Sequence, residues 1–199
     1  MVKLAVIFYS QTGNVYEMAK TAAREGEDAG AEVRLRKCGE LAPPEVVASN
    51  EHWAKTAEAM ADVREASLDD LEWADALMFG TPTRYGLPTS QLKQFIDTTG
   101  QLWAQGRLED RIMSSFTSTQ TSHGGQESTI LALNNTFYHW GGIIVGPGYT
   151  DPLQYDSEIG NPYGASHISS NGPVGEKNRV AVAIQTKRVV AIARRFAGR

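Results

Sequence analysis

The chain has 199 residues, 41% of them hydrophobic and 21% charged, so it is long enough to bury a core without disulfides or a metal. Its net charge of −4 gives no general attraction for nucleic acid, which binds to clustered Lys and Arg. No apolar run approaches the roughly 18 residues of a membrane span, and Met1–Tyr9 resembles no signal peptide. We therefore expect a single cytoplasmic domain, residues 1–199, without nucleic acid or membrane insertion.

Apolar segments with the pattern of strands alternate with helical segments along the chain. The expected strands are 3–9, 31–36, 74–79, 111–117 and 142–145. The expected helices run from Asn14 to an end marked by Gly26 and Gly30, and over 51–66, 90–97, 125–140 and 180–196. This alternation predicts an α/β fold, a doubly wound sheet of five parallel strands in the order 2-1-3-4-5 with helices on both faces. Ligands of such sheets bind beyond the carboxyl ends of the strands, where the strand order reverses.

One long segment breaks this pattern. Residues 146–177 are rich in Gly, Pro, Ser, Asn and Asp and have little periodicity. Irregular segments of this length in a compact domain are usually functional or interfacial. We expect a long irregular loop that serves oligomer assembly or the active site.

The first polar loop, Ser10–Asn14, joins the first strand to the first helix. Such a turn exposes backbone N–H groups at a helix N-terminus, where the helix dipole favours an anion. The side chains of Ser10, Thr12 and Asn14 can donate further hydrogen bonds, and Gly13 permits close backbone approach. The glycine motifs of nucleotide triphosphatases and of dinucleotide folds are both missing. This pattern indicates a phosphate site without a cation, and the alternative is a well-capped helix.

The second loop, Gly80–Gly86, combines backbone-exposing residues with one cation and one aromatic ring. Its N–H groups can meet the N5 and O4 edge of a planar redox ring such as a flavin. Arg84 can favour electron density on the reduced ring, and the aromatic ring of Tyr85 can line one side of the site. The alternative is a Pro-rich turn with Arg84 in a surface ion pair.

The third loop, Phe116–Glu127, carries a dense set of hydroxyl groups and two adjacent glycines. It can bind a pyrimidine-like ring edge together with a phosphate, and the alternative is a flexible surface turn. All three loops follow the carboxyl ends of predicted strands, which favours a shared site. No set of His, Cys, Asp and Glu has the spacing of metal ligands, so we expect no metal.

Five segments form a combination that is specific to one family. They are Phe79–Gly86, Thr99–Trp103, Phe116–Thr119, His123–Glu127 and Pro162–Ala165. On these segments, and nearly from end to end, the chain resembles the WrbA-type flavoproteins, which are FMN-dependent NAD(P)H:quinone oxidoreductases with a flavodoxin-like fold. The resemblance implies FMN as cofactor, NADH or NADPH as electron donor, and a homotetramer, or a dimer in equilibrium with it.

The same resemblance assigns the residues of the site. The phosphate of FMN would be held by Ser10, Gln11, Thr12, Gly13, Asn14 and Val15. The isoalloxazine edge would be held by Pro82, Thr83, Arg84, Tyr85 and Gly86. The other side of the cofactor would be held by Ser118, Thr119, Gln120, Thr121, Ser122, His123 and Gly124. His139 would close the site from a neighbouring subunit, Trp103 would contact the substrate, and Thr12 would also meet the nicotinamide nucleotide.

We hypothesise a ping-pong reaction in which NAD(P)H transfers hydride to the N5 atom of FMN and a quinone then takes both electrons. No side chain is needed as a nucleophile, and Arg84 would give electrostatic support. Two positions depart from the family: residue 12 is often aromatic, and Gln120 stands where glycine is common, which would strain the loop if φ must be positive. The alternatives are a flavodoxin-type electron-transfer protein and a non-catalytic interaction protein.

Overall fold

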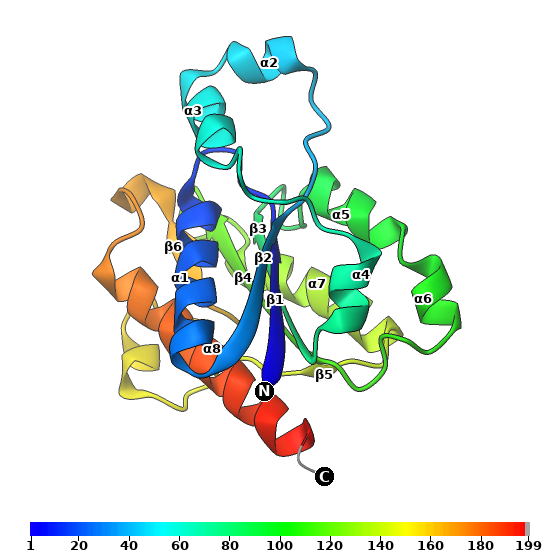
Figure 1. Cartoon of the computed structure of the whole chain (residues 1–199). Helices are drawn as coiled ribbons and strands as arrows, with labels where there is room; N and C mark the ends of the chain where they lie inside the picture. The colour runs from blue at the N-terminus through cyan, green and yellow to red at the C-terminus, as the bar shows by residue number, and fades with distance from the viewer. Residues whose placement is uncertain (198–199) are drawn as a thin grey trace.

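The computed structural model describes residues 1–197, so the last two residues of the expected domain lie outside the described part. Its core is a sheet of parallel strands in the order β2-β1-β3-β4-β5, with β6 paired to β4 (Figure 1). The strands are β1 (Val2–Phe8), β2 (Ala31–Lys37), β3 (Ala76–Pro82), β4 (Ile112–Thr119), β5 (Ile143–Ile144) and β6 (Ser166–Ile168). The predicted order of five strands is confirmed, and β6 is an addition to it.

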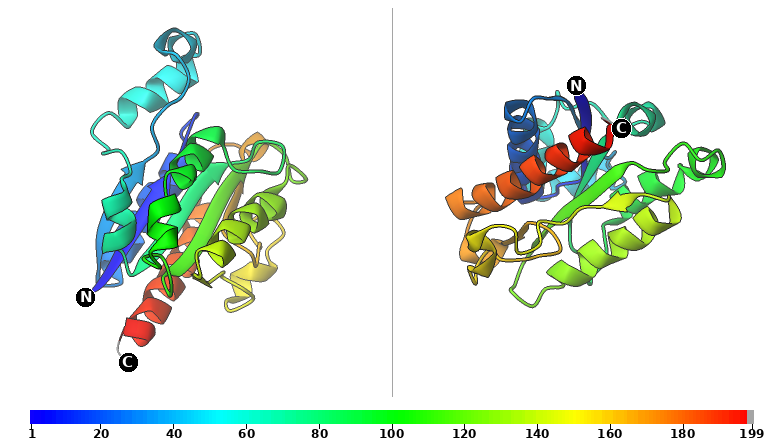
Figure 2. Two further views of the ribbon diagram at one scale, coloured as in Figure 1. Left: turned by 90° about the vertical axis from the view of Figure 1, so that its right-hand side faces the viewer. Right: turned by 90° about the horizontal axis from the view of Figure 1, so that it is seen from below.

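Helices cover both faces of this sheet (Figures 1 and 2). The helices are α1 (Asn14–Asp28), α2 (Pro44–Ala48), α3 (Glu51–Ala59), α4 (Leu68–Trp73), α5 (Ser90–Asp97), α6 (Gly100–Ala104), α7 (Gln126–His139) and α8 (Glu176–Ala197). Of these, α2 and α3 project beyond one end of the sheet and cover neither face. Short 3-10 turns occur at η1 (Pro152–Tyr155) and η2 (Ser169–Asn171). Among residues 1–197, no helix is long and apolar enough to cross a membrane.

The side chains of strand β1 alternate between two hydrophobic cores, one on each face of the sheet. Leu4, Val6 and Phe8 point into the core that α1 and α8 share. Ala5 and Ile7 point into the opposite core, with α4, α5, α6 and α7. Both sets are fully buried, which is why the sequence of a central parallel strand is a nearly continuous apolar run.

Gly26 was expected to mark the end of the first helix, but it lies inside α1. A Cβ atom there would stand 2.7 Å from Cδ2 of Leu4, so glycine lets the helix pack closely on β1. The helix ends before Gly30, whose φ of 79° is left-handed.

The predicted helix over 51–66 was also too long, because α3 ends at Ala59. The residues after it run beside the end of β2: the N–H of Lys37 donates to the carbonyl of Arg64, at 3.0 Å, and the N–H of Ala66 to that of Lys37, at 2.8 Å. Pairing with the sheet therefore outweighs the helical tendency of this stretch. Helices α2, α4 and α6 were not predicted.

Strands β3 and β4 extend into segments that were predicted as loops. Pro82 pairs with Ser118 at the end of the β3–β4 ladder, and Thr119 still belongs to β4. The segment 146–177 contains η1, β6, η2 and the start of α8, so the expectation of an irregular loop was wrong in part. The three residues of β6 are held by their pairing with β4, which local sequence periodicity cannot reveal.

Candidate functional site

The first loop turns from β1 into α1 with most of its hydrogen-bond donors unused. Gly13 caps the helix with a φ of 93° and without a side-chain hydrogen bond. Within residues 1–197, the backbone N–H groups and polar side chains of Ser10, Thr12 and Asn14 have no protein partner. Ser10 is only 2% exposed, so an unpartnered hydroxyl lies in a nearly buried place. A buried hydroxyl is normally satisfied, so that of Ser10, together with the more exposed free donors of Thr12 and Asn14, fits an anion such as a phosphate.

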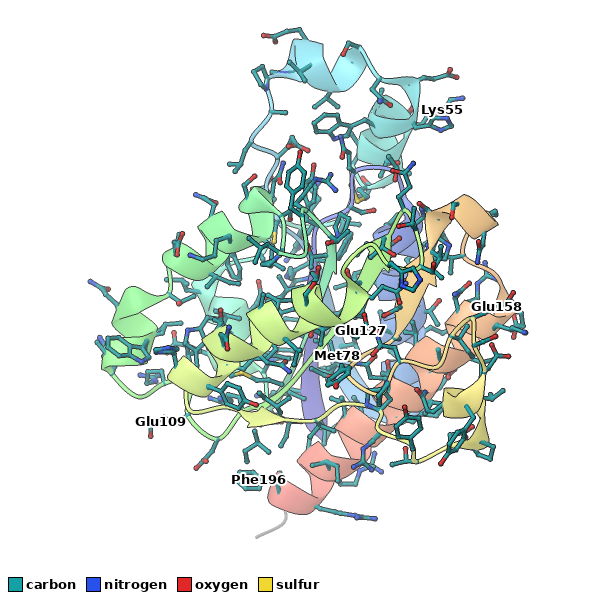
Figure 3. All side chains as sticks on the ribbon, turned by 180° about the vertical axis from the view of Figure 1, so that it is seen from behind. Lys55, Met78, Glu109, Glu127, Glu158 and Phe196 are labelled. Carbon is teal, nitrogen blue, oxygen red and sulfur yellow. The ribbon has the colours of Figure 1, made fainter. Side chains whose placement is uncertain are left out.

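A cavity of about 330 Å³ adjoins this loop between α1 and α3. Lys20, His52 and Lys55 line it together with Thr12 and Gly13, and Figure 3 marks Lys55 on α3. The two lysines form exposed ion pairs with glutamates on their own helices, and exposed pairs of this kind exchange partners readily. Sequence reasoning found no cation in the loop and missed these, because they come from two helices that only the fold brings together.

The second loop is a tight hairpin turn. The backbones of Arg84 and Leu87 exchange two hydrogen bonds, at 2.8 and 3.0 Å, around Tyr85 and Gly86. Tyr85 has a φ of 54° and Gly86 one of 79°, as a two-residue type I′ turn requires. A positive φ on tyrosine costs conformational energy, and its ring projects fully into solvent. The turn therefore presents an aromatic ring at a strained position.

Arg84 joins the second loop to the first. Its guanidinium donates to the side-chain oxygen of Gln11 and, at 2.9 Å, to the carbonyl of Thr83. The structure thus brings together two predicted segments that are far apart in the chain, since Gln11 and Arg84 are separated by 73 residues. A cation stands at the edge of the sheet where the first two loops meet.

The third loop contacts the second at several points. The N–H of Thr83 donates to the carbonyl of Ser118 at 3.0 Å, and the hydroxyls of Thr83 and Thr129 lie 2.8 Å apart. A Cβ atom on Gly125 would stand 2.9 Å from Cα of Gly86, so the two backbones touch. The predicted residues of all three loops therefore lie at one edge of the sheet.

Polar side chains of the third loop are divided between the protein interior and solvent. The hydroxyl of Thr119 donates to the carbonyl of Thr121 at 2.8 Å, and that of Ser118 pairs with His167 at 2.9 Å. The next four residues, Gln120, Thr121, Ser122 and His123, are exposed. Among residues 1–197, positive φ outside glycine occurs only at Tyr85 and Asp110, so Gln120 is not strained.

His139 and Trp103 lie away from the three loops. They meet at the far end of α7, where the indole N–H of Trp103 donates to the carbonyl of His139 at 2.8 Å. The helix has 14 residues, so its two ends are about 20 Å apart at ~1.5 Å per residue. In Figure 3, Glu127 marks the end of α7 near the loops and Glu109 the end near His139. One chain by itself does not bring these two residues to the loops.

Known proteins resemble this chain over its whole length. It is 47% identical over 197 residues to the NAD(P)H dehydrogenase (quinone) of Deinococcus radiodurans, covering 99% of this chain and 98% of that protein. The protein of the same name from Geotalea uraniireducens is 40% identical, with 98% and 99% covered. The chain belongs to the NAD(P)H dehydrogenase (quinone) family. The family expected from the sequence is confirmed.

Two further comparisons agree with this membership. The family model described as NADPH-dependent FMN reductase matches residues 2–151. A flavodoxin, WrbA-like protein from Agrobacterium tumefaciens superposes with a TM-score of 0.68 at 22% identity, covering 98% of this chain and 99% of that one. At this identity the superposition shows the fold, and the expected flavodoxin-like fold is confirmed.

In this member of the NAD(P)H dehydrogenase (quinone) family, the residues of the first loop also suit the phosphate of FMN. Its donors have no protein partner among residues 1–197, and a Cβ atom added to Gly13 would meet only Oγ1 of Thr56, at an ordinary contact distance of 3.5 Å. Among residues 1–197, no group of three His, Cys, Asp or Glu could hold a metal ion.

Proposed function

We propose that this protein is an FMN-dependent NAD(P)H:quinone oxidoreductase that reduces quinones by two electrons to hydroquinones. The observation that carries the proposal is the first loop, whose unpartnered donors stand where the strand order reverses, in a member of the NAD(P)H dehydrogenase (quinone) family. The chemistry that FMN supplies when bound is the transfer of two electrons from NADH or NADPH to a quinone.

The three loops would divide the binding of FMN between them. Residues 10–15 would hold the phosphate by N–H groups and hydroxyls, and Lys20 and Lys55 line the adjoining cavity. Residues 82–86 would hold the edge of the isoalloxazine ring, and residues 118–124 the other side of the cofactor. Each loop starts at the carboxyl end of a different strand, so the rigid sheet fixes their relative positions.

Arg84 would support the reaction by its charge. Its side chain is exposed and held over the first loop by Gln11, and a positive charge there stabilises electron density on a nearby ring. It would act without forming a covalent bond to the substrate.

His139 and Trp103 would act on the site of a neighbouring subunit, because their distance from the loops of the same chain is too great. Support comes from an exposed apolar patch beside the second loop and along α7, made of Tyr85, Leu87, Leu131 and Tyr138. Large exposed apolar patches mark interaction surfaces. We propose a homotetramer, or a dimer in equilibrium with it, of single-domain chains in the cytoplasm.

Absorbance spectroscopy on the purified protein tests the proposed function. FMN is titrated into the apoprotein, NADH or NADPH is added without oxygen, and benzoquinone follows. We expect saturable FMN binding, bleaching of the flavin by at least one nucleotide, and return of its colour with the quinone. Failure of both nucleotides to bleach bound FMN would overturn the assignment as an enzyme and favour an electron carrier. Protein that binds no FMN would favour a non-catalytic interaction protein.

A further inference from the structure

Part of the segment 146–177 supports the third loop, and we call residues 166–172 the brace. Strand β6 pairs with the last residues of β4, placing His167 opposite Ser118 and Ile168 opposite Thr119. Beyond the strand, the N–H of Ser170 donates to the carbonyl of Gln120 at 3.0 Å. The match to the FMN reductase family model ends at residue 151, so this brace lies outside it.

His167 lies at the centre of the brace and is only 2% exposed. Its Nε2 atom is 3.0 Å from the carbonyl oxygen of Gly172, and its Nδ1 atom is 2.9 Å from the hydroxyl oxygen of Ser118. A carbonyl oxygen can only accept, so Nε2 carries a hydrogen. Burial lowers the pKa of His167, despite hydrogen bonds to the backbone of Gly172 and Pro173, and this favours the neutral ring.

A neutral imidazole with hydrogen on Nε2 has a free lone pair on Nδ1. The hydroxyl of Ser118 must therefore donate its only hydrogen to His167. Its oxygen keeps lone pairs, and it can meet a bound molecule only as an acceptor. The backbone carbonyl of Ser118 accepts in addition from the N–H of Thr83, so Ser118 is fixed to both β6 and the second loop.

We infer that His167 is a positioning residue of the FMN site: it orients the hydroxyl of Ser118 as an acceptor for an N–H or O–H group of the cofactor. The inference rests on the proposed function, since it needs FMN at the three loops. It gives the segment 146–177 a role in shaping the site of its own chain. His167 itself reaches the cofactor only through Ser118.

A set of four variants in the full-length protein tests this inference by FMN affinity, measured by fluorescence titration of the apoprotein. His167→Phe keeps an aromatic ring and removes both hydrogen bonds, whereas Ser118→Ala removes only the hydroxyl. Each should weaken FMN binding about tenfold, as expected for one lost hydrogen bond in a buried site. The double variant should bind as weakly as either single one, because both changes remove the same interaction.

His167→Asn is the rescue variant, because the side-chain oxygen of Asn can accept from Ser118 from nearly the position of Nδ1. It should bind FMN within about twofold of the wild type. Ser170→Ala is the matched control in the same brace: its side chain is exposed and its backbone N–H is kept, so its affinity should be unchanged.

The outcomes separate this inference from the proposed function. Wild-type protein that fails to bind FMN refutes the function, and the inference with it. Wild-type protein that binds FMN while Ser118→Ala binds equally well refutes the inference alone. An additive loss of about a hundredfold in the double variant also refutes it, because His167 would then act independently of Ser118. If His167→Phe does not fold, unchanged FMN affinity in Ser118→Ala still refutes the inference, and so does a tenfold loss in His167→Asn, because Asn keeps the acceptor for Ser118.

Discussion

Two glycines hold the same local position in two loops and have different surroundings. Gly13 caps α1 with a φ of 93°, and Gly125 caps α7 with a φ of 90°, both without a side-chain hydrogen bond. A Cβ atom added to Gly13 would make only an ordinary contact, at 3.5 Å, with Oγ1 of Thr56, whereas one added to Gly125 would stand 2.9 Å from Cα of Gly86. The same left-handed turn therefore leaves the backbone of the first loop uncrowded and allows close packing of two loops in the third.

The polar groups of the two loops differ in the same way. In the first loop, the donors of Ser10, Thr12 and Asn14 have no partner within the described residues 1–197. In the third, the hydroxyls of Ser118 and Thr119 are already bonded within the protein. The first loop is thus built to receive hydrogen-bond acceptors, and the inner part of the third to hold its own shape.

The largest effect is expected from Gly125→Ala. The left-handed conformation costs an alanine about 1–2 kcal/mol, and the new Cβ atom would force the backbones of two loops apart. We expect the free energy of unfolding to fall by about 3 kcal/mol and FMN binding to weaken more than about tenfold. Urea unfolding and FMN titration measure the two quantities. A loss of stability no larger than that of Gly13→Ala would remove the distinction between the loops.

Gly13→Ala should give a smaller loss of stability, about 1–2 kcal/mol, because only the backbone conformation is strained. FMN binding should nevertheless weaken about tenfold, since the donors of the first loop would turn away from the phosphate. Riboflavin lacks the phosphate and serves as the control ligand, whose affinity should change less. Equal losses for FMN and riboflavin would argue against a phosphate site in this loop.

Arg84→Ala should change the reaction more than the fold. The side chain is exposed, so we expect the free energy of unfolding to change by less than about 0.5 kcal/mol. Reduction of the bound flavin by NADH or NADPH should slow about tenfold in stopped-flow absorbance. Arg84→Lys keeps the charge and should recover most of the rate. Wild-type turnover in Arg84→Ala would exclude the electrostatic role.

The smallest effect concerns Glu40, which anchors α3 beside the first loop. Its carboxylate accepts from Tyr9, at 2.7 Å, from Trp53 of α3, at 3.0 Å, and from Gln91, at 2.8 Å. Burial alone would raise the pKa of Glu40, but hydrogen bonds from Tyr9, the backbone N–H of Ala42 and Gln91 lower it below 4.5. Stability from this carboxylate is therefore present above pH 4.5 and is lost as the pH falls through the lowered folded-state value.

Amide hydrogen exchange measures this anchoring. Glu40→Gln should speed amide exchange in α3 at neutral pH and leave the exchange rates of α7 unchanged. The reason is that α3 is held to the rest of the domain partly by the hydrogen bond between Trp53 and Glu40. In the wild type, the exchange rate of α3 should approach that of Glu40→Gln as the pH drops below about 4.5. Equal acceleration in α3 and α7 would mean that the change acts on the whole fold and not on the wall of the first loop.

Features that depend on neighbours in the chain could be predicted from the sequence. The strand β1, the loop Ser10–Asn14 and the helix α1 follow one another without interruption, so apolar run, capping residues and helical periodicity identify them locally. The strand order followed from alternation of strands and helices. Helix α5 was predicted with its observed bounds, because its apolar residues have clear helical spacing.

Other features depended on residues far apart in the chain. Lys20 and Lys55 reach one cavity only because α3 lies over α1, and no spacing in the sequence indicates this. His167 was missed for the same reason, since it meets Ser118 across 49 residues. The two residues carried over by resemblance, Trp103 and His139, were found together but far from the loops of their own chain.

The sequence by itself determined the class of fold, the position of the polar loop Ser10–Asn14 and the family, because strand and helix patterns, caps and motifs are local properties of the chain. Only the tertiary structure decided which hydroxyl groups remain available. Ser118 and Ser10 are both serines at the ends of central strands, yet β6 supplies a partner to Ser118, whereas no residue in 1–197 supplies one to Ser10. A hydrogen bond requires two groups within about 3 Å, and folding alone sets that distance for residues distant in sequence.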